Sequence, residues 1–143
     1  MFENVTIVGV GLISGSFALA LKDKGFAKNI IGVSRTQASL DKAKELGIID
    51  EVLPLDEAVK KSDFIYVAIP VDVTVPVMKQ IMDNITDKQI VADAGSTKYT
   101  LCKSLENHPK RKRFVATHPM WGTEYSGPEA AVRDAFKDRS CVI

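Results

Sequence analysis

Three small residues near the start of the chain are spaced to hold a phosphate group. Gly9, Gly11 and Ser14 follow the β-branched run 5–8 and open an apolar-periodic segment. Gly9 lets the chain turn sharply, and Gly11 lacks the Cβ that would keep a pyrophosphate away; Ser14 is small enough for close helix–strand packing. The following helix directs free N–H groups and its positive dipole end at the anion. We therefore predict a dinucleotide site formed by Gly9, Gly11, Leu12 and Ile13.

A histidine and a serine that each follow a predicted strand could move and orient a proton. Ser96 comes after the run 89–93, and His118 comes after the run 114–117. Ligands gather at the carboxyl ends of strands in an open α/β sheet, so both residues are expected at the crevice of the glycine turn. Imidazole titrates near pH 6.5 when unperturbed and can act as a base. A lone histidine is more often structural, but this position favours a catalytic His118.

The end of the second predicted strand bears on the choice between NAD and NADP. A dinucleotide fold normally places a carboxylate there to hold the ribose 2′-hydroxyl. This chain has Ser34, Arg35 and Thr36 instead. The planar guanidinium of Arg35 suits a phosphate. We therefore predict NADP as the cofactor; the alternative is that Arg35 is solvated and the site uses NAD.

Alternating strand-like and helix-like segments must position these residues. This alternation predicts an α/β fold of Rossmann type, a doubly wound, mainly parallel sheet with helices on both faces. The apolar run 63–70 suits a central strand, and Ile69 and Pro70 at its end are expected beside the cofactor. Pro76 is expected in the first turn of its helix. The predicted strands are 5–8, 29–34, 63–70, 89–93, 114–117 and 139–143; the predicted helices are 12–24, 37–46, 55–61, 73–85 and 97–106, with 126–137 partly helical.

Composition narrows the class of protein. The 143 residues are 45% hydrophobic and 26% charged, which is ordinary for one soluble domain. The net charge of +1 gives no reason to expect a nucleic acid or a membrane as partner, and the basic run 110–113 is interpreted as a solvated turn. No signal peptide is apparent, and Cys102 and Cys141 have no metal-ligand spacing, so we expect a cytoplasmic protein without a metal site. A final strand without a predicted neighbour suggests a fragment of a larger protein.

Three motifs together resemble those of the prephenate/arogenate dehydrogenase family of tyrosine biosynthesis. They are GVGLISGS at 9–16, DAGSTK at 93–98 and HPMWGTE at 118–124. Many dehydrogenases share the first motif, whereas the other two, in this order and spacing, are much more specific. The resemblance covers essentially all of residues 1–143 and is to the nucleotide-binding domain of the family.

The resemblance implies oxidative decarboxylation of a small cyclohexadienol, prephenate or arogenate, with hydride transfer to the nicotinamide. In that reaction His118 takes the proton of the substrate hydroxyl, and Ser96 orients this pair near the nicotinamide. Thr123 and Glu124 match loop residues that approach the substrate. The segment 34–36 resembles the NADP-using branch of the family.

Two departures from the family pattern stand out. Trp121 replaces a residue that is often small, and it either narrows the pocket or caps a hydrophobic edge. The C-terminal helical domain, which completes the substrate site and forms the homodimer in the family, is absent from residues 1–143. We therefore expect this chain alone to bind dinucleotide and to turn over substrate poorly or not at all.

Two alternative functions stay open. Small β-hydroxy acid dehydrogenases use a similar first domain, but they rely on a lysine of the helical domain, so His118 argues against them. A dinucleotide-sensing domain without catalysis is the other alternative.

Overall fold

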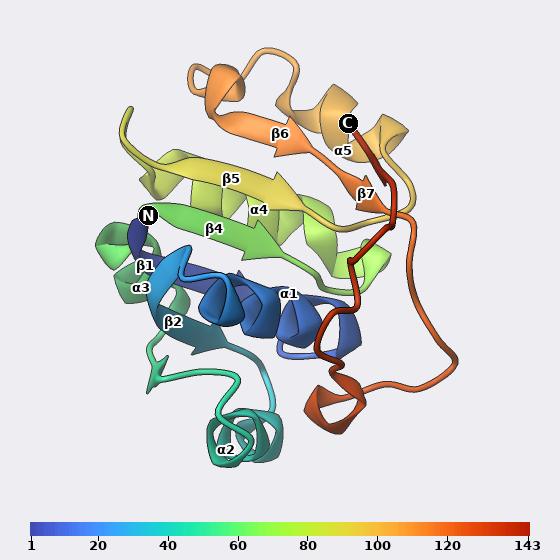
Figure 1. Ribbon diagram of the computed structural model, residues 1–143. Helices are drawn as coiled ribbons and strands as arrows, with labels where there is room; N and C mark the ends of the chain where they lie inside the picture. Colours follow the sequence, from blue (N-terminus) through green and yellow to red (C-terminus); the bar gives the residue numbers. More distant parts are fainter.

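The computed structural model describes residues 1–143 and contains a six-stranded parallel sheet (Figure 1). The strand order is β3-β2-β1-β4-β5-β6, so the first strand is central and pairs with β2 on one side and β4 on the other. The strand order reverses between β1 and β4, which is where open α/β sheets bind ligands. The strands of this sheet are β1 (Phe2–Val8), β2 (Ala27–Val33), β3 (Glu51–Val52), β4 (Phe64–Val67), β5 (Ile90–Asp93) and β6 (Phe114–Ala116).

Five α-helices cover the two faces of the sheet. Successive strand residues point to opposite faces. Val5, Ile7 and Tyr66 accordingly pack in one core cluster with α1 and α2, whereas Val8 and Ile65 pack in the other with α3, α4 and α5. The predicted Rossmann-type architecture is therefore confirmed. The helices are α1 (Leu12–Asp23), α2 (Gln37–Glu45), α3 (Leu55–Lys61), α4 (Val71–Asn84) and α5 (Tyr99–Leu105), with a short 3₁₀ helix η1 (Arg111–Arg113) before β6.

The helix after β4 begins earlier than its sequence pattern indicates. The predicted helix 73–85 starts at Val71, so Pro76 lies in the second turn, and the prediction of a first-turn proline is wrong. The hydroxyl of Thr74 donates to the carbonyl oxygen of Pro70 over 2.9 Å and so binds the start of this helix. Pro76 removes one main-chain hydrogen bond from the helix, which the remaining turns tolerate.

The segment after β6 departs most from the predictions. Of the partly helical stretch 126–137, only the 3₁₀ turn η2 (Pro128–Ala130) is present. The predicted last strand is reduced to β8 (Cys141–Val142), which pairs antiparallel with β7 (His118–Pro119). The expectation of a final strand without a neighbour is therefore wrong. The chain continues beyond β6 as the short strand β7, and the last residues of the chain pair with it.

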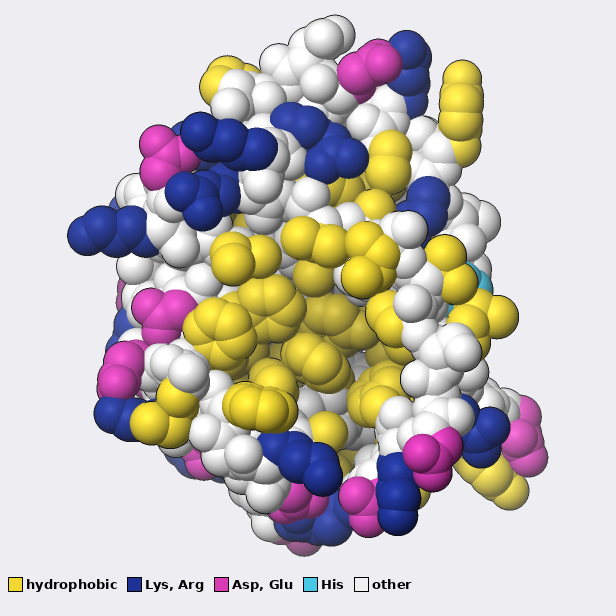
Figure 2. All heavy atoms as spheres, turned by 45° about the horizontal axis from the view of Figure 1, so that its top comes forward, with side chains coloured by type: hydrophobic (Ala, Val, Ile, Leu, Met, Phe, Trp, Pro, Cys, Tyr) yellow, Lys and Arg dark blue, Asp and Glu magenta, His cyan; other side chains and the backbone are white.

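An apolar hollow lies on the face of the sheet that carries α1. Figure 2 shows hydrophobic side chains gathered there. Its volume is about 350 Å³, and the lining includes Phe17, Phe64 and Tyr66 together with Phe136 and Cys141 of the C-terminal segment. The rings of Phe17 and Tyr66 lie 4.3 Å apart between centroids. These aromatic contacts join α1 to β4 at the middle of the sheet.

Candidate functional site

The turn between β1 and α1 has the geometry expected of a phosphate cradle. Gly9 has φ +88°, and a Cβ there would lie 2.3 Å from the carbonyl oxygen of Ala68, so only glycine fits. A Cβ at Gly11 would meet no atom within 4 Å, which leaves the backbone approachable. No protein group accepts from the N–H groups of Leu12 and Ile13, the first residues of α1. Open space and free donors at a helix N-terminus suit a pyrophosphate.

The side chain of Ser14 also makes hydrogen bonds within this turn. Its side chain is fully buried. The hydroxyl donates to the carbonyl oxygen of Gly9 over 2.5 Å and accepts from the N–H of Gly11 over 3.1 Å. Ser14 therefore ties the two glycines of the turn together, a role that the sequence motif alone does not show.

A cleft of about 570 Å³ opens where β1, β2 and β4 end. Arg35 is exposed at this cleft, and no acidic side chain pairs with it. The hydroxyl of Ser34 accepts from the N–H of Thr36 over 3.3 Å, so the short segment between β2 and α2 is folded on itself. Six of the residues predicted to bind the cofactor line this one cleft: Gly9, Ser34, Arg35, Thr36, Ile69 and Pro70.

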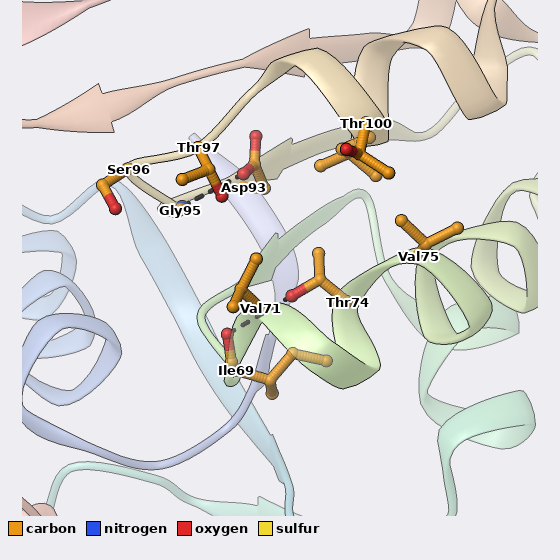
Figure 3. Close-up of a pocket in the computed structure, with 10 residues that line it drawn as sticks. Ile69, Val71, Thr74, Val75, Asp93, Gly95, Ser96, Thr97 and Thr100 are labelled. Atoms are coloured by element: carbon orange, nitrogen blue, oxygen red, sulfur yellow. Dashed lines mark hydrogen bonds between the residues drawn. The ribbon is translucent and has the colours of Figure 1, made fainter.

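A second cavity, of about 410 Å³, lies between α4 and the loop that follows β5 (Figure 3). Ile69 lines both this cavity and the larger cleft, so the two adjoin. Ser96 lies at the end of the cavity away from Val75 and Thr100, on the loop between β5 and α5. The structure thus brings Ser96 next to the cleft of the predicted cofactor residues.

Asp93 links the loops that carry Ser96 and His118. It ends β5, and its carboxylate accepts from the N–H of Gly95 over 3.0 Å and from the N–H of Thr117 over 3.3 Å. The ammonium group of Lys98 pairs with the same carboxylate. The sequence motifs alone predict no role for this aspartate, although an acidic residue at the end of a buried apolar strand indicates one.

His118 lies at the same edge of the sheet as Ser96, two residues beyond β6. Its side chain is half-buried, makes no hydrogen bond within the chain and lines neither cavity. Thr123 and Glu124 are exposed in the loop after β7, where the Thr123 hydroxyl accepts from the N–H of Tyr125 over 3.2 Å. Ser96 and His118 thus follow the carboxyl ends of neighbouring strands, whereas Thr123 and Glu124 line neither cavity.

Of the two roles predicted for Trp121, narrowing the pocket or capping a hydrophobic edge, the structure supports the second. Its ring meets that of Phe136 edge-on, with 5.7 Å between the centroids, and Phe136 meets Phe17 in the same way at 6.1 Å. The indole therefore caps an apolar edge beside α1.

Two further findings bear on the kind of site. No three metal-ligating side chains gather in the chain. None of the helices has both the length and the apolar character needed to cross a bilayer.

The fold and the glycine turn define a Rossmann-type domain of the class that binds nicotinamide dinucleotides. A family model described as "Prephenate dehydrogenase, nucleotide-binding domain" matches residues 17–143. The chain belongs to this family.

Known relatives agree with this assignment. The chain is 34% identical to prephenate dehydrogenase of Lactococcus lactis, over 99% of this chain and 40% of the relative. A crystal structure of prephenate dehydrogenase from A. aeolicus, in complex with hydroxyphenyl propionate and NAD+, matches with a TM-score of 0.89 and 36% identity, over 99% of this chain and 50% of that one. Synechocystis arogenate dehydrogenase matches with a TM-score of 0.84 and 26% identity, over 97% and 49%. The chain thus spans half or less of the length of each.

Proposed function

We propose that this chain is the cofactor-binding part of a two-domain enzyme that oxidatively decarboxylates prephenate or arogenate in tyrosine biosynthesis. The observation that carries the proposal is the common edge of the sheet. The phosphate turn after β1, the Ser96 loop after β5 and His118 after β6 all follow carboxyl ends of parallel strands, within a chain of this family.

The residues present fit a dinucleotide. The open space at Gly11 and the free N–H groups of Leu12 and Ile13 suit its pyrophosphate, and the cleft extends from Gly9 to Arg35. When bound, the nicotinamide accepts the hydride. We assign the cofactor as NADP because Arg35 is an unpaired guanidinium where a carboxylate would select NAD.

In this proposal His118 is the general base. It accepts the proton of the substrate hydroxyl as the hydride leaves the carbon that bears it. Ser96 holds that hydroxyl in line with the imidazole, and Thr123 and Glu124 approach the far end of the substrate. The bond between the ring and the carboxylate then breaks, and its electron pair moves through the ring to the carbonyl oxygen formed by the oxidation. Carbon dioxide leaves, the ring becomes aromatic, and the phenolate oxygen takes a proton.

We also propose a cytoplasmic location and a homodimeric assembly for the full-length protein. Cys102 and Cys141 are free thiols, which supports a reducing cytoplasm. Because the relatives are at least twice as long as the matched part, we assign two features to a helical domain beyond residues 1–143: an arginine that binds the substrate carboxylate, and the homodimer contact.

Cofactor choice is tested by titrating the purified 143-residue chain with NADP and NAD. Arg35→Ala should weaken NADP binding about tenfold to a hundredfold, as expected for lost charge-assisted hydrogen bonds, and leave NAD binding unchanged. Lys88→Ala removes an equal charge at the amino edge of the sheet, before β5, and should change neither affinity. Equal effects of Arg35→Ala on both cofactors would exclude the assignment to NADP.

The reaction is tested by assaying the full-length protein with prephenate and arogenate. His118→Asn should abolish turnover and preserve cofactor binding. Retained turnover would refute His118 as the general base, whereas a parent protein that binds dinucleotide but oxidises neither substrate would favour the dinucleotide-sensing alternative. The 143-residue chain should show little or no activity. Rapid oxidation of prephenate or arogenate by this chain would contradict the proposal that turnover needs a second domain.

A further inference from the structure

We propose that Asp93 is a positioning residue for Ser96 and His118, an inference that rests on the function proposed above. Asp93 is 1% exposed at the end of β5. Its Oδ2 accepts from the N–H of Gly95 over 3.0 Å, and its Oδ1 accepts from the N–H of Thr117 over 3.3 Å. Gly95 immediately precedes Ser96, and Thr117 immediately precedes His118. One carboxylate therefore binds the backbone one residue before each of the two groups assigned to the chemistry.

The contact with Thr117 is made twice. The hydroxyl of Thr117 also donates to the main-chain carbonyl of Asp93. The β5–β6 ladder ends at the pair Asp93–Ala116, and these two hydrogen bonds extend the link between the strands to the residue before β7. The position of His118 relative to the Ser96 loop thus depends on Asp93 from both its backbone and its side chain.

The charge of Asp93 has no role in packing the core. A buried carboxylate is unfavourable unless it is paired and hydrogen-bonded. Lys98 supplies the pair, from a side chain that is 26% exposed. An apolar residue could fill this strand end without that requirement, but it could not accept donors from two separate loops. The two backbone N–H groups that it accepts from therefore explain a carboxylate at this position.

Nuclear magnetic resonance of the 143-residue chain tests this inference without any activity. Asp93→Asn keeps the shape of the side chain, removes its charge and replaces one acceptor oxygen by a donor. We expect displaced signals for the Ser96 amide and the His118 ring. His108, the other histidine, bonds to Asp83 at 3.1 Å and to the N–H of Lys110, so its ring signals should stay in place.

A matched control exists at the opposite edge of the sheet. Oδ2 of Asp63 accepts from the N–H groups of Glu3 and Asn4 over 2.8 and 3.0 Å, and so also joins two segments. In the full-length protein, Asp93→Asn should lower kcat about tenfold to a hundredfold, the range expected for misplaced reacting groups, with dinucleotide affinity changed less than about twofold. Asp63→Asn should lower the melting temperature and leave kcat unchanged. If Asp93→Asn behaves like Asp63→Asn and the His118 signals do not move, the inference is wrong.

Thr117→Ala covers the case in which Asp93→Asn does not fold. It removes one hydrogen bond to Asp93 and leaves the pair with Lys98 intact. A lowered kcat with displaced His118 signals would support the inference, and unchanged values of both would overturn it. His118→Asn in the same assay separates the two proposals. Its full activity would refute the catalytic role of His118 in the proposed function, whereas the signals displaced by Asp93→Asn bear on the positioning alone.

Discussion

The hydroxyl of Ser14 donates to the carbonyl oxygen of Gly9 over 2.5 Å and accepts from the N–H of Gly11 over 3.1 Å. The serine at the third glycine position thus closes the turn with a side chain that glycine lacks. Both partners are main-chain groups, so these bonds set the shape of the turn before any ligand binds.

Ser14→Ala should lower the free energy of unfolding by about 1–3 kcal/mol, because two turn groups lose their partner at a buried position. Urea unfolding would measure this change. Ser39→Ala, at a half-buried serine of α2 without hydrogen bonds of its side chain, should change it by less than about 0.5 kcal/mol. Equal effects of the two substitutions would mean that the Ser14 hydrogen bonds contribute nothing measurable.

The two glycines of the turn should respond differently to alanine. At Gly9 a Cβ would meet the carbonyl of Ala68 at 2.3 Å with φ +88°, so Gly9→Ala should cost about 3 kcal/mol or more, or prevent folding. Gly11→Ala meets no atom and should retain the melting temperature within a few degrees. The new methyl group would nevertheless stand where the pyrophosphate approaches, and the Kd for dinucleotide should rise about tenfold or more, which is at least about 1.4 kcal/mol. Unchanged binding by Gly11→Ala would place the phosphates elsewhere.

Local sequence patterns were sufficient to predict five of the six strands of the sheet and its five α-helices, but not the two-residue strand β3 (Glu51–Val52), which is too short to show a period. The strands are short apolar runs bounded by turn residues, as in 64–67, and their helices carry a 3.6-residue period. The meeting of Gly9, Arg35 and Ile69 at one cleft was predictable for the same reason, since each of them follows a strand of one parallel sheet.

The C-terminal segment could not be predicted in this way, because contacts far apart in sequence direct its path. The N–H of Val132 donates to the hydroxyl of Ser16 over 2.8 Å, and the Cβ of Ala131 lies 2.9 Å from where a Cβ of residue 15 would stand. Gly15 thus admits this segment against α1. The role of Asp93 was missed for a similar reason, since its partner Thr117 is 24 residues away.

A buried pair of hydroxyls between β1 and the end of α3 offers a test of hydrogen-bond energetics. The oxygens of Thr6 and Ser62 lie 2.5 Å apart, and Ser62 donates to the carbonyl oxygen of Ala58 over 2.8 Å. Ser62→Ala should cost about 1–3 kcal/mol, because it leaves Thr6 with Ala58 at 3.4 Å as its remaining partner.

Thr6→Val should cost less than Ser62→Ala, since Ser62 keeps its bond to Ala58. The double variant should be less destabilised than the sum of the two single variants, with an interaction energy of at least about 0.5 kcal/mol in a cycle measured by urea unfolding. Strict additivity would show that the two hydroxyls act independently.

Tyr66 should make the fold sensitive to alkali. Its side chain is 4% exposed, and burial raises the pKa of its hydroxyl above the ordinary value of 10.0, with Cys141 and Asp93 adding to the effect. The folded chain therefore keeps this proton at a pH where the unfolded chain releases it. The corresponding stability is fully present below pH 10 and is lost as pH rises above it, by up to about 1.4 kcal/mol per pH unit.

Tyr66→Phe isolates this contribution, because it removes the ionisable group and keeps the ring between Phe17 and Phe64. No hydrogen bond of the Tyr66 hydroxyl is lost, so stability at neutral pH should change by less than about 0.5 kcal/mol. Above pH 10 the variant should unfold at higher urea concentration than the parent chain, and the difference should grow with pH. Tyr99→Phe, at a tyrosine that is 82% exposed, serves as the control and should show no such growth. If the stabilities of Tyr66→Phe and the parent chain depend on pH in the same way, burial does not raise the pKa of the Tyr66 hydroxyl.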